Sequence, residues 1–168
     1  MNKGKLDLDP TRYEAMTSTP PELVADILTA AHSIYLATLA TPFARANNMK
    51  YTDAKRAPHC IQTSEEIANH LNDLSKGYEA DISDRYFGPK HLMHFVTEIS
   101  ASEIDEPIIA DATWQQFLPE RGFGIRLGER LWRRPPEVLI GTPQEVARVA
   151  MGYGFSQEQA RSWTPRPA

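Results

Sequence analysis

The chain has 168 residues, of which 41% are hydrophobic, with a formal net charge of -4 at pH 7 and one cysteine. This length fits one domain with its own core, so we expect residues 1–168 to form a single domain whose polar segment 1–18 is only partly ordered. The negative charge disfavours nucleic acid or a membrane surface as a partner, and one cysteine excludes an internal disulfide. The sequence shows no signal peptide and no window near 18 apolar residues, which predicts a cytoplasmic protein without a membrane span.

Two amphipathic helices are predicted in the first half of the chain. The first follows Thr19, a capping residue, and has prolines in its first turn and apolar residues at helical spacing. Residues 44–59 are polar with a proline near the end, which predicts a long loop. The second helix begins near Cys60 and ends at Lys76-Gly77, and its apolar spacing places Cys60 on the inward face of the first turn.

Strands are predicted after these helices. The segments 94–100 (HFVTEIS) and 107–114 (PIIADATW) are rich in β-branched and aromatic residues, and the acidic segment 101–106 joins them. Residues 78–86 (YEADISDRY) are ambiguous. Two adjacent antiparallel strands after helices predict an α+β fold, with N-terminal helices packed on a small antiparallel sheet.

The last third of the chain is predicted to be irregular and then helical. Residues 118–136 contain several glycines and prolines and favour irregular structure. Thr142, Pro143 and Glu145 form the signature of a capped helix, and Ser156 and Gln159 repeat its cap.

A lone cysteine is more often a small buried residue than a nucleophile, but the position of Cys60 favours chemistry. Backbone amides and the dipole at a helix N-terminus stabilise a thiolate. His94 opens the first predicted strand and Asp111 closes the apolar run of the second, so neighbouring antiparallel strands can place them side by side. The pattern predicts a catalytic triad in which Asp111 orients His94 and His94 deprotonates Cys60.

A helix-borne cysteine, a strand-initial histidine in HFVTE and a strand-terminal aspartate in IIADATWQQF resemble the compact transglutaminase-like branch of the papain-like cysteine enzymes. The resemblance covers about residues 56–119 and is most specific in DATWQQF. It implies a papain-like core and a cysteine-dependent acyl-transfer enzyme that forms an S-acyl intermediate from an amide or thioester. The donor would be a protein glutamine, a carrier-bound acyl group or a small amide. The acceptor would be water or an amine, so hydrolysis, deamidation and amide formation all stay open.

Other residues near the triad are candidates for substrate binding, each with an ordinary structural alternative. His59 would lie at the pocket entrance or be a solvated loop residue, and Trp114 would be core or a substrate-facing wall. Gln115 and Gln116 would line the site or make structural hydrogen bonds. The glutamine that papain-like enzymes place upstream of the cysteine has no counterpart, which leaves Asn47, Asn48 or a backbone amide as the second oxyanion donor.

A zinc site and a non-catalytic binding module are the alternatives to an enzyme. His91 and His94 with Cys60 could suggest zinc, but no glutamate stands at a ligand spacing, and we expect no metal and no cofactor. The fold could also serve as a non-catalytic binding or partner-recognition module. The sequence indicates no oligomeric state.

Overall fold

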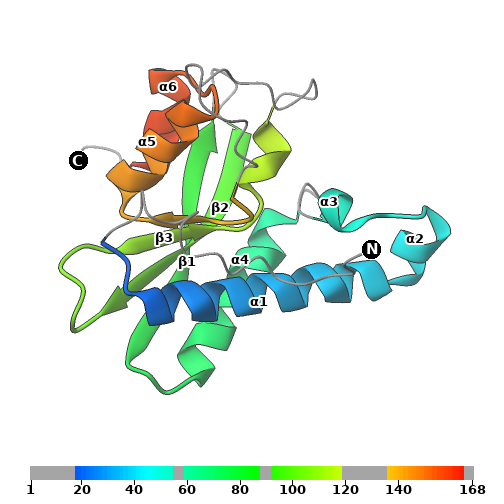
Figure 1. Cartoon of the computed structure of the whole chain (residues 1–168), viewed down its shortest axis with the longest axis horizontal. Helices are drawn as coiled ribbons and strands as arrows, with labels where there is room; N and C mark the ends of the chain where they lie inside the picture. The colour runs from blue at the N-terminus through cyan, green and yellow to red at the C-terminus, as the bar shows by residue number, and fades with distance from the viewer. Residues whose placement is uncertain (1–17, 55–58, 88–91, 119–135, 165–168) are drawn as a thin grey trace.

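In the computed structural model the chain forms a four-stranded antiparallel sheet with helices packed on it. The structure describes residues 18–54, 59–87, 92–118 and 136–164. The strands lie side by side in chain order (Figure 1): β1 (Tyr78–Phe87), β2 (Leu92–Ala101), β3 (Ile108–Asp111) and β4 (Leu139–Gly141). The α+β class with a small antiparallel sheet is therefore confirmed. The predicted partial order of residues 1–18 lies, apart from Ser18, outside the described residues, and so does His91.

The strands differ from the prediction in several places. The strand predicted to open at His94 is β2, which already begins at Leu92, so His94 lies inside the strand and not at its start. The ambiguous segment is β1, which pairs with β2 along its whole length. The strand predicted over 107–114 ends at Asp111, because the Asp111 side chain accepts a hydrogen bond from the backbone N–H of Thr113 and turns the chain into a short 3-10 helix, η2 (Trp114–Phe117). The three-residue strand β4 was not predicted, since so short a run has no periodicity.

Helices α1 (Pro21–Ala40) and α4 (Cys60–Asp73) confirm the two predicted helices. The predicted cap at Thr19 is wrong: Pro20 occupies the cap position of α1, and the buried Thr19 hydroxyl has no hydrogen-bond partner among the described residues. The stretch 44–59 predicted as a loop overlaps the end of one short helix, α2 (Pro42–Ala46), and contains a second, α3 (Tyr51–Ala54).

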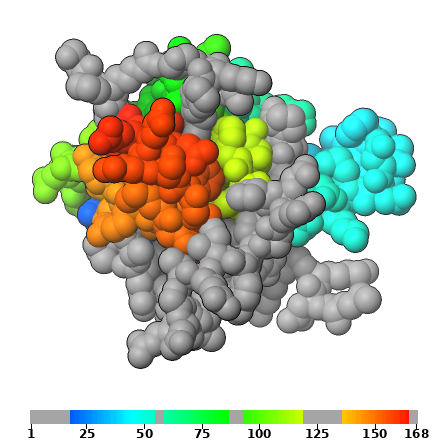
Figure 2. All heavy atoms as spheres, turned by 90° about the horizontal axis from the view of Figure 1, so that it is seen from above, coloured from blue at the N-terminus to red at the C-terminus, as the bar shows by residue number. Residues whose placement is uncertain are grey.

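Two apolar clusters cover the two faces of the sheet. Helices α1 and α4 build the first cluster against residues such as Ala80 and Ile99. The second cluster joins Val96 and Ile109 on the other face to η2, α5 (Pro143–Gly152), α6 (Gln157–Ala160) and η3 (Arg161–Trp163). Figure 2 shows α5 and α6, in orange and red, next to the yellow-green segment that contains η2. The capping boxes predicted for α5 and α6 are both formed.

Helix α1 also has the length and composition of a possible membrane span, which differs from the prediction that no window comes near one. Its residues Pro21–Leu39 have a mean hydropathy of 1.2. In this fold Leu23, Ile27 and Tyr35 are buried in the first cluster, so the packing of α1 on the domain accounts for these apolar residues.

Candidate active site

A buried histidine and a buried aspartate are hydrogen-bonded on the face of the sheet that α5 covers. His94 Nε2 lies 2.8 Å from Asp111 Oδ2, and neither side chain is exposed. The backbone N–H of Thr113 donates to the other carboxylate oxygen, Oδ1, at 3.1 Å. Both oxygens of the buried carboxylate therefore have hydrogen-bond partners, as a buried polar group requires. Because Nε2 faces the carboxylate, Nδ1 is the imidazole nitrogen that remains for a second partner.

Cys60 reaches this pair from the first turn of α4. Its thiol is partly buried and hydrogen-bonds to His94. This hydrogen bond is the main cause that lowers the pKa of Cys60; burial raises it, and a backbone hydrogen bond with Phe95, the charge of His94 and a backbone hydrogen bond with Ile61 lower it further. On β2, β3 pairs only with Thr97–Ile99, so the N-terminal half of β2 extends beyond β3. The thiol and the imidazole meet at this open part of the sheet.

The pKa of His94 is shifted in the opposite direction. Burial alone would disfavour the charged imidazolium and lower the pKa. The charge and hydrogen bond of Asp111 outweigh burial and, with smaller contributions from Cys60, raise the pKa of His94 to about 9. A cysteine with a lowered pKa beside a histidine with a raised one favours a thiolate–imidazolium pair, the reactive form of a cysteine nucleophile.

The start of α4 leaves backbone amides close to the sulfur. His59 occupies the cap position and makes no side-chain hydrogen bond to the first turn, while its carbonyl accepts from the Thr63 N–H at 2.9 Å. The first N–H groups of a helix have no partner within the helix, and together with the dipole they stabilise negative charge. The backbone hydrogen bond of Ile61 with the Cys60 thiol is one contact of this kind.

The structure separates the four predicted substrate-binding residues. Trp114 and Gln115 are buried, and both side chains donate to the carbonyl of Pro136, at 3.2 and 2.9 Å. They belong to the core, so we remove them from the candidate binding residues. Gln116 lies beside the triad, with Nε2 3.4 Å from His94 Nδ1, and His59 is exposed next to Cys60.

The remaining sequence candidates lie away from these contacts. Asn47 donates its side-chain amide to the Phe43 carbonyl at 2.9 Å, and Asn48 has a positive φ of 50° at the end of α2. Both residues therefore belong to the end of α2, where Asn47 uses its amide within the helix. Within the described parts of the chain, no group of three or more His, Cys, Asp or Glu residues could hold a metal ion.

Sequence reasoning missed two aromatic residues that contact the triad. Trp163, in η3, donates its indole N–H to Asp111 Oδ2 at 2.9 Å. Phe117 packs edge-on against the His94 ring, with ring centroids 4.9 Å apart. The aromatic Phe117 in the quoted DATWQQF motif was a signal that could have been used, whereas nothing in the local sequence connects Trp163 with Asp111.

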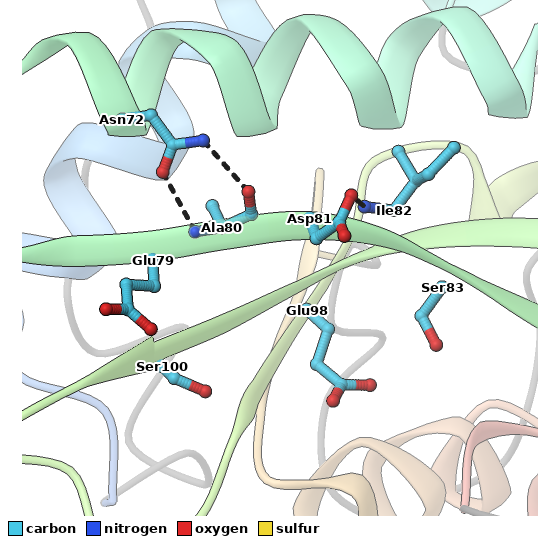
Figure 3. A pocket seen from close by; sticks show the side chains of 8 residues that line it. All are labelled: Asn72, Glu79, Ala80, Asp81, Ile82, Ser83, Glu98 and Ser100. Atoms are coloured by element: carbon cyan, nitrogen blue, oxygen red, sulfur yellow. Dashed lines mark hydrogen bonds between the residues drawn. The ribbon is translucent and has the colours of Figure 1, made fainter.

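An acidic groove lies farther along β1, and its lining takes in residues from both sides of this strand, including Asn72 of α4. It holds about 560 Å³, and its lining includes Glu79, Asp81, Ser83 and Glu98. In the antiparallel register Asp81 is paired with Glu98 and Arg85 with His94, so these acidic residues of the groove and the imidazole belong to one side of β1 and β2. Figure 3 shows Glu79, Ser83 and Glu98 on this side of the strands and α4, with Asn72, on the opposite side.

No family model, curated protein or solved structure matches this chain. The geometry of the site and the chemistry of its residues are therefore the basis for a functional hypothesis.

Proposed function

We propose that this protein is a cysteine-dependent acyl-transfer enzyme with Cys60 as nucleophile, His94 as general base and acid, and Asp111 as the residue that orients His94. The observation that supports the proposal is one continuous chain of hydrogen bonds, from the Cys60 thiol through the His94 ring to the buried Asp111 carboxylate. A nucleophile, a base and an orienting group within hydrogen-bond reach of one another are the signature of covalent acyl transfer.

In the first step, His94 takes the proton of Cys60 at Nδ1 and the thiolate attacks the carbonyl carbon of an amide or thioester. The carbonyl oxygen becomes an oxyanion, which the amides of the first α4 turn can bind. The tetrahedral intermediate then expels the amine or thiol, and the imidazolium returns the proton to this leaving group. The product of this half-reaction is an S-acyl Cys60 with a neutral His94.

In the second step, His94 takes a proton from water or from an amine, and the resulting nucleophile attacks the thioester. The sulfur leaves as a thiolate, and with the proton kept on His94 the thiolate–imidazolium pair is restored. Water as acceptor gives hydrolysis or deamidation, and an amine gives a new amide. Both routes use the same three residues, so we propose the acyl-enzyme chemistry and keep both acceptors. A protein glutamine, a carrier-bound acyl group and a small amide are the proposed donors.

The arrangement also supports a papain-like core as the finer description of the α+β fold. The shared features are a cysteine at the start of a helix, a histidine on the strand that this helix packs against and an aspartate on the next strand. These elements occur in the chain order of the transglutaminase-like branch. A cytoplasmic location is part of the same proposal.

The test is the detection of the acyl-enzyme. The intact protein is incubated with p-nitrophenyl acetate at pH 7 and its mass is measured at short times. Cys60 is the only cysteine of the chain. The proposal is supported by a burst of p-nitrophenol together with a mass increase of one acetyl group on the protein. This acetyl group should be lost again during incubation in buffer, and Cys60→Ala should show neither the burst nor the adduct. His94→Gln keeps the thiol but removes the base and should slow the burst.

A second measurement on the same protein distinguishes the enzyme from a non-catalytic binding module. Iodoacetamide labelling of Cys60 at pH 6 should be faster than labelling of a free cysteine in a peptide, because the lowered pKa of Cys60 increases the thiolate fraction. Labelling no faster than the peptide, together with no acetyl adduct, would reject the enzyme and favour the module.

A further inference from the structure

A fourth residue, far from the triad in the sequence, shares the critical oxygen of Asp111. Asp111 Oδ2 lies 2.8 Å from His94 Nε2 and 2.9 Å from the indole Nε1 of Trp163. Trp163 is completely buried and belongs to η3, at the end of the described chain. A single carboxylate oxygen therefore receives both the imidazole N–H and an indole N–H.

We infer that Trp163 is a positioning residue for the triad: its indole N–H fixes the Asp111 carboxylate in the orientation that holds His94 toward Cys60. This inference rests on the proposed function, because it concerns the reactivity of Cys60 through His94 and Asp111. In this role Trp163 acts on the sulfur through Asp111 and His94 and takes no part in proton transfer.

The chemistry of the indole suits this role. An indole N–H donates one hydrogen bond and does not titrate in the physiological range, so it holds the carboxylate oxygen at every pH at which the triad works. The Thr113 N–H holds Oδ1, and Trp163 holds Oδ2, so donors from two separate elements fix both ends of the carboxylate. A carboxylate fixed at both ends cannot rotate away from the imidazole when the ring becomes protonated.

The surroundings of Trp163 keep its N–H in place. Its ring packs against Phe155 with centroids 5.3 Å apart and an interplanar angle of 75°, within the cluster that covers this face of the sheet. The variant Trp163→Phe keeps an aromatic ring at this place and removes the N–H together with part of the indole ring. A matched control is therefore needed to separate the two contributions of Trp163, to packing and to the carboxylate.

The chain offers a matched control. Trp114 is another completely buried tryptophan of the same cluster, and its indole N–H donates to the Pro136 carbonyl at 3.2 Å rather than to the triad. Trp114→Phe and Trp163→Phe therefore remove the same group from the same core. Only the second removes a hydrogen bond to Asp111.

The experiment measures the rate of Cys60 alkylation by iodoacetamide from pH 5 to pH 10 in the full chain and in both variants, with thermal melting as a check of folding. We expect Trp163→Phe to slow alkylation at pH 6 by about 10- to 100-fold, the effect of a lost hydrogen bond to a charged group. Its pH profile should shift towards that of an ordinary thiol. Trp114→Phe should lower the melting temperature by a similar amount and leave the profile unchanged.

A second measurement covers the case in which Trp163→Phe does not fold. The indole N–H resonance of Trp163 in the unmutated protein is followed by NMR over the same pH range, and it should move with the midpoint of Cys60 alkylation. An unmutated protein whose Cys60 reacts like a free peptide thiol would reject the proposed function. Three other outcomes would reject only the role of Trp163, provided that Cys60 of the unmutated protein is alkylated rapidly. These are an alkylation profile that Trp163→Phe does not change, equal changes of the profile in both variants, and an indole resonance that does not shift at the pH midpoint of Cys60 alkylation.

Discussion

His94 of the triad and Glu98 of the acidic groove lie on the same side of β2, yet the charged groups of the two regions have opposite surroundings. At the triad, His94 and Asp111 are completely buried and each nitrogen or oxygen atom described has a specific partner. In the groove, Glu79 and Asp81 are exposed to solvent, and Glu98 is half-exposed with Arg85 as its ion-pair partner at 3.0 Å. Burial thus changes within a few residues of β2, from the buried His94 to the partly exposed Glu98.

This difference separates buried charged groups with fixed partners from charged groups that water surrounds. Buried charges are costly unless they are paired and hydrogen-bonded, so a buried pair of this kind is kept only where its partners are fixed. Exposed carboxylates are screened by water and contribute little to stability. Changes at the triad should therefore have large and specific effects, whereas changes in the groove should have small ones.

The largest effect is expected for Cys60→Ala. The variant loses the nucleophile, so turnover of any acyl donor should fall to background, while the fold persists because the partly buried thiol supplies little packing. Burst kinetics with p-nitrophenyl acetate and circular dichroism check the two parts. An active Cys60→Ala variant would contradict the assignment of the nucleophile.

Asp111→Asn should reduce turnover by up to about 10⁴-fold, the loss known for an amide in place of a triad aspartate, because it favours the wrong imidazole tautomer and does not stabilise the imidazolium. The shape of the side chain is kept, so we expect a folded protein with weak activity and a slower-reacting Cys60. Steady-state turnover and alkylation rates measure this. A variant that unfolds, or one with unchanged rates, would make Asp111 a structural strand-end residue.

The pH dependence of stability tests the burial of His94. Its pKa is raised from 6.5 to about 9, so its contribution to the free energy of unfolding is full below pH 6.5 and is lost as the pH rises through about 9. Cys60, with a lowered pKa, contributes in the opposite direction. We therefore use Cys60→Ala, and expect its free energy of unfolding to decrease from pH 6 to pH 9.5 by at most about 3 kcal/mol.

Urea unfolding of Cys60→Ala at both pH values measures this decrease, and the double variant with His94→Gln is the control. The double variant should lose much less stability over the same range. A larger stability at pH 9.5 than at pH 6 in Cys60→Ala would show that His94 is buried in its neutral form.

The smallest effect is expected in the groove. Glu79→Gln removes one exposed carboxylate from the lining and should change the free energy of unfolding by less than about 0.5 kcal/mol. The pH profile of Cys60 alkylation should also stay the same. A shifted profile would mean that the groove and the triad are electrostatically coupled, and the contrast between the two regions would then fail.

Local sequence signals predicted much of the fold. Apolar periodicity found α1 and α4, and cap signatures found α5 and α6. They failed at Thr19, where a capping residue type lies one position too early, and at Trp114, where the chain leaves the strand after the Asp111 turn. Local patterns describe which conformations a segment can adopt, but the neighbouring contacts decide where it begins and ends.

The sequence by itself determined which residue types were available for chemistry: one cysteine at the start of a helix, and a histidine and an aspartate on strands that can be neighbours. Only the tertiary structure decided that Trp114 and Gln115 serve the core, that Gln116 lies beside His94, and that Trp163 donates to Asp111. The physical reason is that hydrogen bonds between residues far apart in the chain depend on the register of the sheet and on the docking of η3. Neither of these leaves a periodic trace in the sequence.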